Sequence, residues 1–373
     1  MKRLLLAAVL VLTVWGLVRE SQRGTFDRAE KAFVGWLAAN TSRSALLPPL
    51  SLVLYDDEAS QLAGVDRMGA LDSALFVRAA MRLGAIAAGV EGLRENPARM
   101  IEASAGLPVF GGYEWNDPPG AGWTPLVGEP AVTWPESPGL AGEASRFSRG
   151  FLSAPGGGAG SPEIRLLARN ADRAVPSMLV LAWGAAQGAK ARHLSVDPAG
   201  VRFGKSRLPV DRSGSARFFP AAAVGVMSMN ELLLAAENFE RGQAPSPVDG
   251  HVLILARATS DVTRVERGSE RPLVAAEAVF QSWDALRRGT LFLSPGFWYP
   301  VALSVFALCL LFAPGFGTAR AVLWGGVLLV LLFLIVSLGL FAGNRILLPS
   351  VPFAATLLAG LLARLFSRYH TSP

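Results

Sequence analysis

Residues 296–373 contain three long apolar stretches and not one Asp or Glu. The stretches cover residues 297–313, 321–342 and 346–366, and short loops separate them. Their lengths suit helices that cross a bilayer, because its hydrocarbon core takes about 20 apolar residues in a helix. This part of the sequence therefore predicts three transmembrane helices that end in a short cytoplasmic tail.

A fourth apolar segment follows the charged start of the chain, Met1-Lys2-Arg3. Residues 4–18 carry no charge, which is the layout of a signal peptide or of a signal anchor. The segment is short for a span, and its cleavage site is weak. We favour a membrane anchor over residues 1–18, with a removable signal peptide as the alternative.

The basic residues near these segments give them an orientation. Six cations lie outside residues 19–295, namely Lys2, Arg3, Arg320, Arg345, Arg364 and Arg368. A cytoplasmic amino terminus would place all of them except Arg345 in the cytoplasm, in agreement with the positive-inside rule. Removing these six from the 35 Lys and Arg residues leaves 29 cations against 29 carboxylates in residues 19–295. The net charge of +6 is thus a signal of topology, and it gives no reason to expect a nucleic-acid partner.

Composition also bears on which sites the chain can hold. A single cysteine, Cys309, and three histidines predict neither a disulfide framework nor a metal centre. The expected spans lack internal Asp, Glu and Lys, which disfavours a transporter. Small residues such as Gly339 and Gly343 permit close helix packing. We attribute them to packing within the hairpin, while contacts in a homo-oligomer stay open.

Residues 19–295 are expected to form one α/β domain outside the cytoplasm. Its main elements are helices over residues 26–39 and 71–83 and strands over residues 50–55, 85–90 and 251–256. A strand, a helix and a strand within about forty residues form a βαβ unit, so parallel pairing is expected. We predict a mixed sheet with flanking helices and an antiparallel insertion.

The rest of this domain is less periodic. Residues 104–162 form a Pro-, Gly- and Trp-rich excursion without a clear period. Short strands over residues 201–203, 206–210 and 215–219 predict a hairpin meander. Ser228 and Glu231 have the spacing of a capping box, and residues 272–288 are expected to form the last helix of the domain.

In this order, the segments resemble the second type of CHASE domain, an extracellular sensor found with bacterial cyclases and histidine kinases. Residues 50–60 look like its first strand and acidic-Ser motif, residues 67–83 like the next helix, and residues 83–91 like the step into the next strand. Residues 164–186, 208–219, 228–234 and 249–255 are similar to its later elements. Glu91 departs from the usual Asp, His251 from a common Lys, and Arg257 from a frequent Gly.

The resemblance implies a periplasmic sensor domain followed by three membrane helices. Family members usually continue into a cyclase, kinase or phosphatase module. We expect no catalytic output domain here, so any signal would pass to a separate membrane or envelope protein.

Two motifs resemble functional sites, a phosphate loop and a catalytic histidine, but we interpret both as structural. Residues 200–206 resemble a phosphate loop but have one residue too few between the glycines, so we expect a turn. His251 follows Asp249 closely, yet no Ser or Cys nucleophile stands in context, so we expect a histidine at the start of a strand. No catalytic, cofactor-binding or metal-binding residue is assigned.

One constellation supports a ligand-site hypothesis. If the strands over residues 50–55, 85–90 and 251–256 are parallel neighbours, their carboxyl ends meet where open α/β sheets bind ligands. The side chains expected at this rim are Asp56, Asp57, Glu91, Arg257 and Ser260. The alternative is an internal cluster of salt bridges and turns that ends the strands.

Two functions follow from these observations. The first is a sensor or regulatory protein of the bacterial inner membrane that recognises an unknown ligand and acts through a membrane partner. The second is a structural subunit that scaffolds an envelope complex. An envelope hydrolase is disfavoured, because the sequence shows no nucleophile and base pair.

Overall fold

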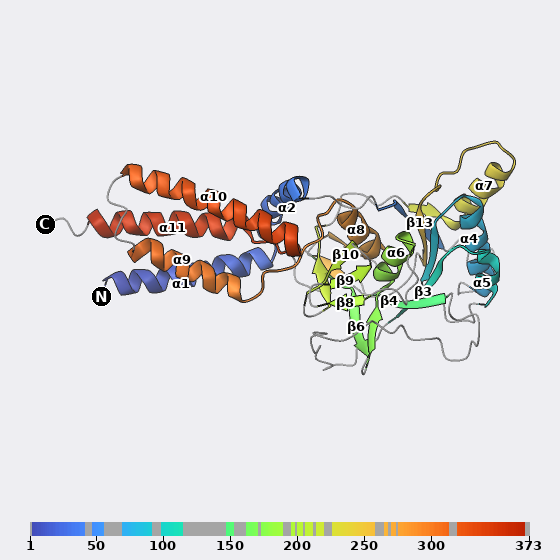
Figure 1. Cartoon of the computed structure of the whole chain (residues 1–373), viewed down its shortest axis with the longest axis horizontal. Helices are drawn as coiled ribbons and strands as arrows, with labels where there is room; N and C mark the ends of the chain where they lie inside the picture. Colours follow the sequence, from blue (N-terminus) through green and yellow to red (C-terminus); the bar gives the residue numbers. More distant parts are fainter. Residues whose placement is uncertain are drawn as a thin grey trace. The chain divides into compact units, whose positions relative to one another are not determined.

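The chain divides into two units in the computed structural model (Figure 1). The helical unit comprises Met1–Arg43, Gly157–Pro162 and Phe292–Pro373, and the α/β unit comprises Ser44–Gly156 and Glu163–Leu291. The structure describes residues 2–41, 47–55, 69–91, 98–114, 147–152, 162–170, 173–188, 195–197, 200–203, 206–211, 214–219, 226–257, 265–267, 270–273, 275–312 and 319–369. The helix expected at residues 26–39 thus groups with the helical unit rather than with the α/β unit.

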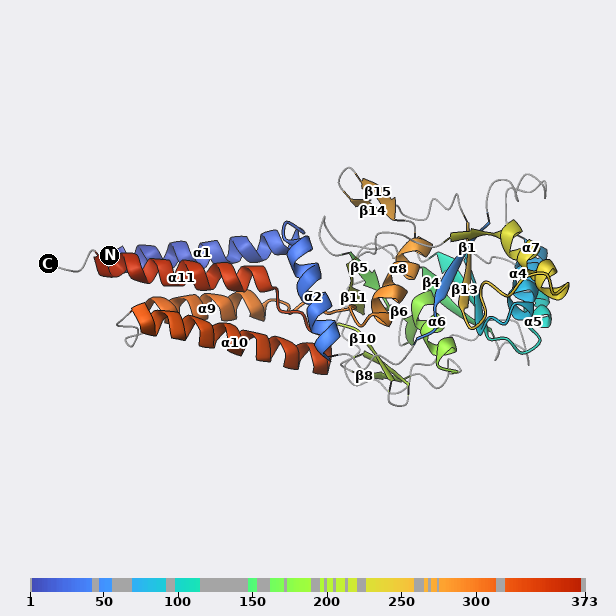
Figure 2. The ribbon, with the colours of Figure 1, turned by 90° about the horizontal axis from the view of Figure 1, so that it is seen from above.

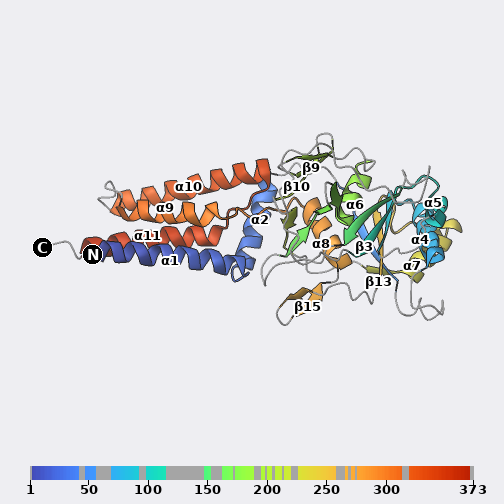
Figure 3. The same ribbon diagram turned by 90° about the horizontal axis from the view of Figure 1, so that it is seen from below.

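Four apolar helices run along the helical unit, and a fifth helix runs across them (Figure 2, Figure 3). The four are α1 (Lys2–Gln22), α9 (Trp298–Phe312), α10 (Ala319–Asn344) and α11 (Ser350–Tyr369). The crossing helix is α2 (Asp27–Thr41). Side chains of α1, α9 and α11, including Val14, Ala307 and Phe353, pack together as the core of the bundle. The apolar stretches of the sequence are therefore helices, as predicted.

The structure supports fewer membrane spans than the sequence predicts. Among the described helices, Leu4–Gln22 and Trp324–Asn344 are long and apolar enough to cross a membrane. The apolar helices Trp298–Phe312 and Ser350–Ala363 are shorter, so the prediction of four spans is not confirmed. The last stretch also differs from its prediction, because its helix does not begin at residue 346. Leu347 instead donates its backbone N–H to the carbonyl of Leu293 at 3.0 Å, and α11 begins at Ser350.

A six-stranded sheet forms the centre of the α/β unit, in the order β12-β1-β13-β2-β3-β4. Its strands are β12 (Val226–Ser228), β1 (Leu50–Tyr55), β13 (Val252–Arg257), β2 (Ala87–Glu91), β3 (Val109–Glu114) and β4 (Phe147–Leu152). Every described pairing is parallel, so the prediction of a mixed sheet is wrong. Antiparallel pairs occur in separate small sheets. The prediction that three of these strands are parallel neighbours is confirmed, since β13 lies between β1 and β2.

Helices cover both faces of this sheet, because its strands are apolar on both sides. The helices α4 (Ala70–Arg82), α5 (Ala98–Ser104) and α7 (Met229–Glu240) share a buried core with one face. The helices α6 (Met178–Ala186) and α8 (Ala275–Arg287) pack against the other (Figure 1). Gly89 of β2 permits this second contact. A Cβ there would lie 2.3 Å from the Phe110 ring and 2.8 Å from the Met178 methyl group.

Local signals in the sequence explain where some helices begin. The capping box is confirmed at α7, where the Glu231 N–H donates to Ser228 Oγ at 3.1 Å. The Ser228 N–H in turn donates to Glu231 Oε2 at 2.7 Å. The helix expected from residue 272 is wrong at its start. Pro272 belongs to β15 (Glu270–Leu273), which pairs with β14 (Val265–Arg267), and a proline is tolerated in such an edge strand.

The less periodic segments also contain strands that the sequence analysis did not predict. The strands β3 and β4 of the main sheet lie within residues 104–162, whereas the tryptophans of that excursion lie outside the described residues. The small antiparallel sheets are β8 (Ser195–Asp197) with β9 (Gly200–Phe203) and β10 (Ser206–Pro209), β5 (Glu163–Arg165) with β11 (Ser215–Arg217), and β6 (Leu167–Asn170) with β7 (Arg173–Pro176). The run that resembles a phosphate loop lies in the β9–β10 hairpin, as expected. The third strand of the predicted meander pairs with β5 instead.

Candidate functional site

The carboxyl ends of β1, β13 and β2 lie side by side, where the sequence predicts a ligand rim. Tyr55 of β1 is the partner of Arg257 of β13, and Leu255 is the partner of Val90 of β2. This register brings the last residues of the three strands, Tyr55, Arg257 and Glu91, to one edge of the sheet. The fold therefore provides the strand arrangement on which the site hypothesis depends.

The structure describes two of the five predicted rim residues. Glu91 ends β2 and is buried, with 2% of its surface exposed. Arg257 ends β13. Asp56, Asp57 and Ser260 lie outside the described residues. The structure thus brings the backbones of two of the five residues to the same edge.

The burial of Glu91 bears on what it can do. A carboxylate transferred from water into a protein interior is costly unless other groups stabilise its charge. Because Glu91 has almost no surface left for solvent, its described geometry favours a contact within the fold over direct contact with a dissolved ligand. This burial agrees with the alternative given above, an internal cluster that ends the strands, and that alternative stays a prediction.

A second polar group at this edge was not predicted. Tyr55 donates its hydroxyl to Asp72 Oδ2 at 3.4 Å, and the Gly69 N–H donates to the same oxygen at 2.9 Å. Asp72 lies in the first turn of α4, where a carboxylate stabilises the helix amino terminus. The contact therefore fastens the start of α4 to the end of β1. An acid at the second position of the predicted helix, residues 71–83, was the available signal in the sequence.

The opposite, amino-terminal edge of the sheet holds a serine and histidine pair. Ser51 Oγ of β1 lies 2.8 Å from His251 Nδ1, and His251 immediately precedes β13. In the sequence, His251 stands close to Asp249, and no nucleophile is assigned to them. Ser51 was not predicted to lie beside His251, since 200 positions separate the two side chains. Parallel pairing of β1 with β13 was the signal that could have found it.

The surroundings of His251 keep its imidazole neutral. Burial lowers the pKa of His251 below 6.5, the charge of Arg287 lowers it further, and Asp249 opposes both. Arg287 donates its Nε to the Leu47 carbonyl at 3.1 Å, so α8 holds this cation beside the edge. A neutral imidazole with Nδ1 as the acceptor can take the hydrogen bond from the Ser51 hydroxyl.

Ser51 and His251 are close enough to act as a nucleophile and its base, but their place in the sheet does not suit that role. A hydroxyl within 3 Å of an imidazole nitrogen meets the distance criterion. Ser51, however, sits between the buried Leu50 and Leu52 on a central strand, at the edge opposite the one where open α/β sheets bind ligands. We interpret the pair as a structural contact that joins β1 to β13.

No other site chemistry stands out in the described part of the chain. Among those residues, no group of His, Cys, Asp and Glu is arranged to hold a metal ion. No protein-family model matches the chain, and neither a curated protein nor a solved structure is significantly similar to it.

Proposed function

We propose that this chain is a membrane-anchored sensor or regulatory protein of the CHASE type, without catalysis of its own. Its α/β unit would lie outside the cytoplasm of a bacterium and act through a separate protein in the inner membrane. The observation that carries the proposal is the outward face of α10. Only 11% of its apolar window is buried, whereas the core helix of a soluble protein would be mostly buried.

The exposed side chains of α10 support insertion into lipid. Trp324 and Leu328 each expose 67% of their surface, and Ile335 exposes 65%. Apolar side chains in such numbers along one helix are unusual on a soluble protein and mark a surface that lipid or protein covers. Apart from α10, the helix α1 also has the length and hydropathy of a span.

The placement of charges supports four spans with the amino and carboxyl termini of the chain both in the cytoplasm. The start of α1, the end of α9, the start of α10 and the end of α11 lie at the same end of the helical unit (Figure 1). Five of the six cations outside residues 19–295 belong to these helix ends. The sixth, Arg345, follows α10 at the opposite end of the helical unit. Cytoplasmic ends rich in Lys and Arg satisfy the positive-inside rule. The shorter apolar segments Trp298–Phe312 and Ser350–Ala363 would then cross a locally thinned bilayer.

Cysteine labelling in intact cells tests this topology. In a Cys309→Ala background, we compare Gln243→Cys, in the exposed turn after α7, with Ser372→Cys near the carboxyl terminus. A membrane-impermeant maleimide should label position 243 in intact cells and position 372 only after permeabilisation. Labelling of position 372 in intact cells, or protection of position 243, would reverse the proposed orientation.

A second comparison separates a sensor from a scaffold, the alternative function. The partner is captured by cross-linking in mild detergent from cells that carry the wild type, Asp57→Asn or Glu91→Gln. In a sensor, such changes at the rim alter the activity of the partner while the complex persists. In a scaffold, the complex either persists with unchanged activity or is lost. Recovery of no membrane partner would contradict both functions.

A further inference from the structure

The helix α2 presents an unusual exposed face. It buries Glu30, Val34, Leu37 and Ala38. Its exposed side chains are Arg28, Ala29, Lys31, Ala32, Gly35, Trp36, Ala39 and Asn40. These include two cations, small apolar residues and one large aromatic ring, but no carboxylate, since Glu30 is buried and Asp27 is half-buried. A soluble surface helix would usually carry charges of both signs on such a face.

Trp36 continues the outward face of the bundle. Its ring stacks on Phe33 with the centroids 5.9 Å apart, and Phe33 stacks on Phe333 of α10 at 6.0 Å. On α10, Leu332 exposes 54% of its surface and Val336 exposes 42%. Trp36 itself exposes 41%. The aromatic contacts therefore join the exposed ring of α2 to the apolar side of a candidate span.

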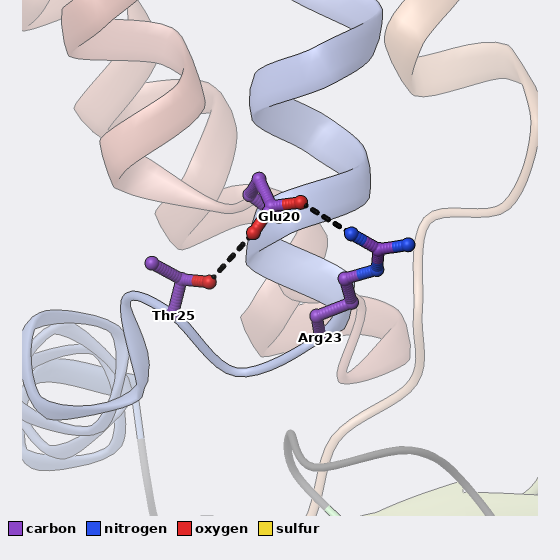
Figure 4. Close-up of polar contacts among 3 residues, drawn as sticks. All are labelled: Glu20, Arg23 and Thr25. Atoms are coloured by element: carbon purple, nitrogen blue, oxygen red, sulfur yellow. Dashed lines mark hydrogen bonds and ion pairs between the residues drawn. The ribbon is translucent and has the colours of Figure 1, made fainter.

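The turn between α1 and α2 helps to set the direction of α2. Glu20 accepts a hydrogen bond from Arg23 at 2.7 Å and another from Thr25 at 2.9 Å (Figure 4). Between them, Gly24 adopts a φ of +89°, which favours glycine. The chain thus ends α1 and turns at once into α2, which runs across the long helices rather than along them (Figure 2, Figure 3).

A second contact holds the other side of α2 against the bundle. Glu30 accepts hydrogen bonds from the backbone N–H groups of Ser350 and Val351 at 3.0 and 2.9 Å. These groups begin α11, so the carboxylate caps that helix. With Glu30 fixed there, the face that bears Arg28 and Trp36 is directed away from α11.

From these contacts we propose that α2 lies in the membrane surface and binds the head groups of anionic phospholipids. The occupant of its exposed face is the bilayer that α10 crosses, so the inference rests on the proposed membrane insertion. Arg28 supplies positive charge for phosphate groups, with Lys31 beside it on the exposed face, and the amphipathic ring of Trp36 suits the interfacial layer.

An environment-sensitive fluorophore on the full-length protein tests the proposal. In the Cys309→Ala background, Ala32→Cys places the probe on the exposed face of α2. Leu328→Cys on α10 is the control for lipid contact, and Gln243→Cys is the control for water. The proteins are reconstituted in vesicles of phosphatidylcholine with or without phosphatidylglycerol, and lipid-borne and aqueous quenchers are compared.

We expect the probe at position 32 to emit at shorter wavelength than at position 243 and to respond to quenchers near the head groups. Phosphatidylglycerol should strengthen this response. The substitution Arg28→Gln should weaken insertion in anionic vesicles by roughly fivefold, because each cation near such a surface contributes on that scale. Lys31→Gln is the matched second variant.

The outcomes separate this inference from the proposed function. If the protein inserts, as quenching at position 328 reports, but position 32 behaves like position 243, then α2 does not contact lipid and the inference is wrong. A probe at position 32 that is shielded from both quenchers would indicate a protein partner and would also overturn it. If position 328 is itself accessible to aqueous quencher, membrane insertion fails and the inference fails with it.

Discussion

Replacement of Glu30 should loosen the start of α11. The carboxylate is 4% exposed, and it accepts three hydrogen bonds from residues that lie 320 and 321 positions away in the sequence. Two are the N–H bonds of Ser350 and Val351, and the third comes from Ser350 Oγ at 3.3 Å. In Glu30→Ala these donors lose their acceptor in a buried place, which costs on the order of 2–3 kcal/mol.

Hydrogen exchange at the two amides measures this cost directly. A loss of that size corresponds to roughly 30- to 150-fold faster exchange of the Ser350 and Val351 N–H groups. Glu30→Gln keeps one acceptor oxygen but sets an amide NH₂ group against the remaining donors, so its effect should be smaller, on the order of fivefold to tenfold. The intrinsic exchange rates stay the same, because residue 30 is distant in sequence.

The pH dependence of this contact has a definite sign. Burial raises the pKa of Glu30 above 4.5, and it outweighs the hydrogen bonds from Val351 and Ser350, which lower it. A group whose pKa is raised on folding stabilises the fold most below its unfolded pKa, and this contribution declines as the pH rises through the folded pKa. The stability of the wild type in chemical unfolding should therefore decline as the pH rises through the folded pKa of Glu30, and Glu30→Gln, which cannot ionise, should lack this decline.

An exposed position on the same helix provides the control. Ala32→Gln changes α2 without touching α11, so exchange at Ser350 and Val351 should not change. The reasoning would be refuted if Glu30→Ala left the exchange of both amides at the wild-type rate. It would also be refuted if the control accelerated exchange equally, since the effect would then belong to α2 as a whole.

Three further changes test the α/β unit, each by chemical unfolding of the purified protein. Gly89→Ala should destabilise this unit by about 1–3 kcal/mol, because the added methyl group overlaps the Phe110 ring; unchanged stability would contradict the packing. Burial lowers the pKa of His251, so the wild type should lose stability as the pH falls below 6.5. His251→Gln should remove this dependence, and a dependence that persists in the variant would contradict its assignment to His251. Ser228→Ala should cost about 1 kcal/mol through the lost cap of α7, whereas Ser228→Asp should retain most of the stability.

The features that could be predicted from the sequence are those with a local cause. Apolar stretches long enough for a helix became α9, α10 and α11, and the spacing of Ser228 and Glu231 became a capping box. The shared direction of β1 and β2 also has a local cause, since the helix α4 connects these two successive strands. In each case the pattern lies within one element or its immediate neighbour.

The contacts that could not be predicted join distant parts of the chain. Ser51 and His251 are 200 residues apart, and their distance depends on the exact register of two strands. Glycine-rich β3 has a low strand propensity, so its place in the sheet depends on packing against its neighbours. Of the predicted rim, Glu91 is buried, and no local pattern in the sequence separates a buried acid from one that faces a ligand.

The position of α2 illustrates how one buried acid can change the assignment of an element. Helical spacing predicts that Ala29 lies on one apolar stripe with Phe33 and Leu37, yet Ala29 is exposed in the structure, whereas Glu30 is buried. An acid on the inner face makes sense only with donors opposite it, and the first amides of α11 are those donors. The helix that precedes β1 is therefore bonded to the start of α11. In the proposed sensor, a displacement of α2 away from α11 would have to break the three hydrogen bonds that Glu30 accepts at the start of α11.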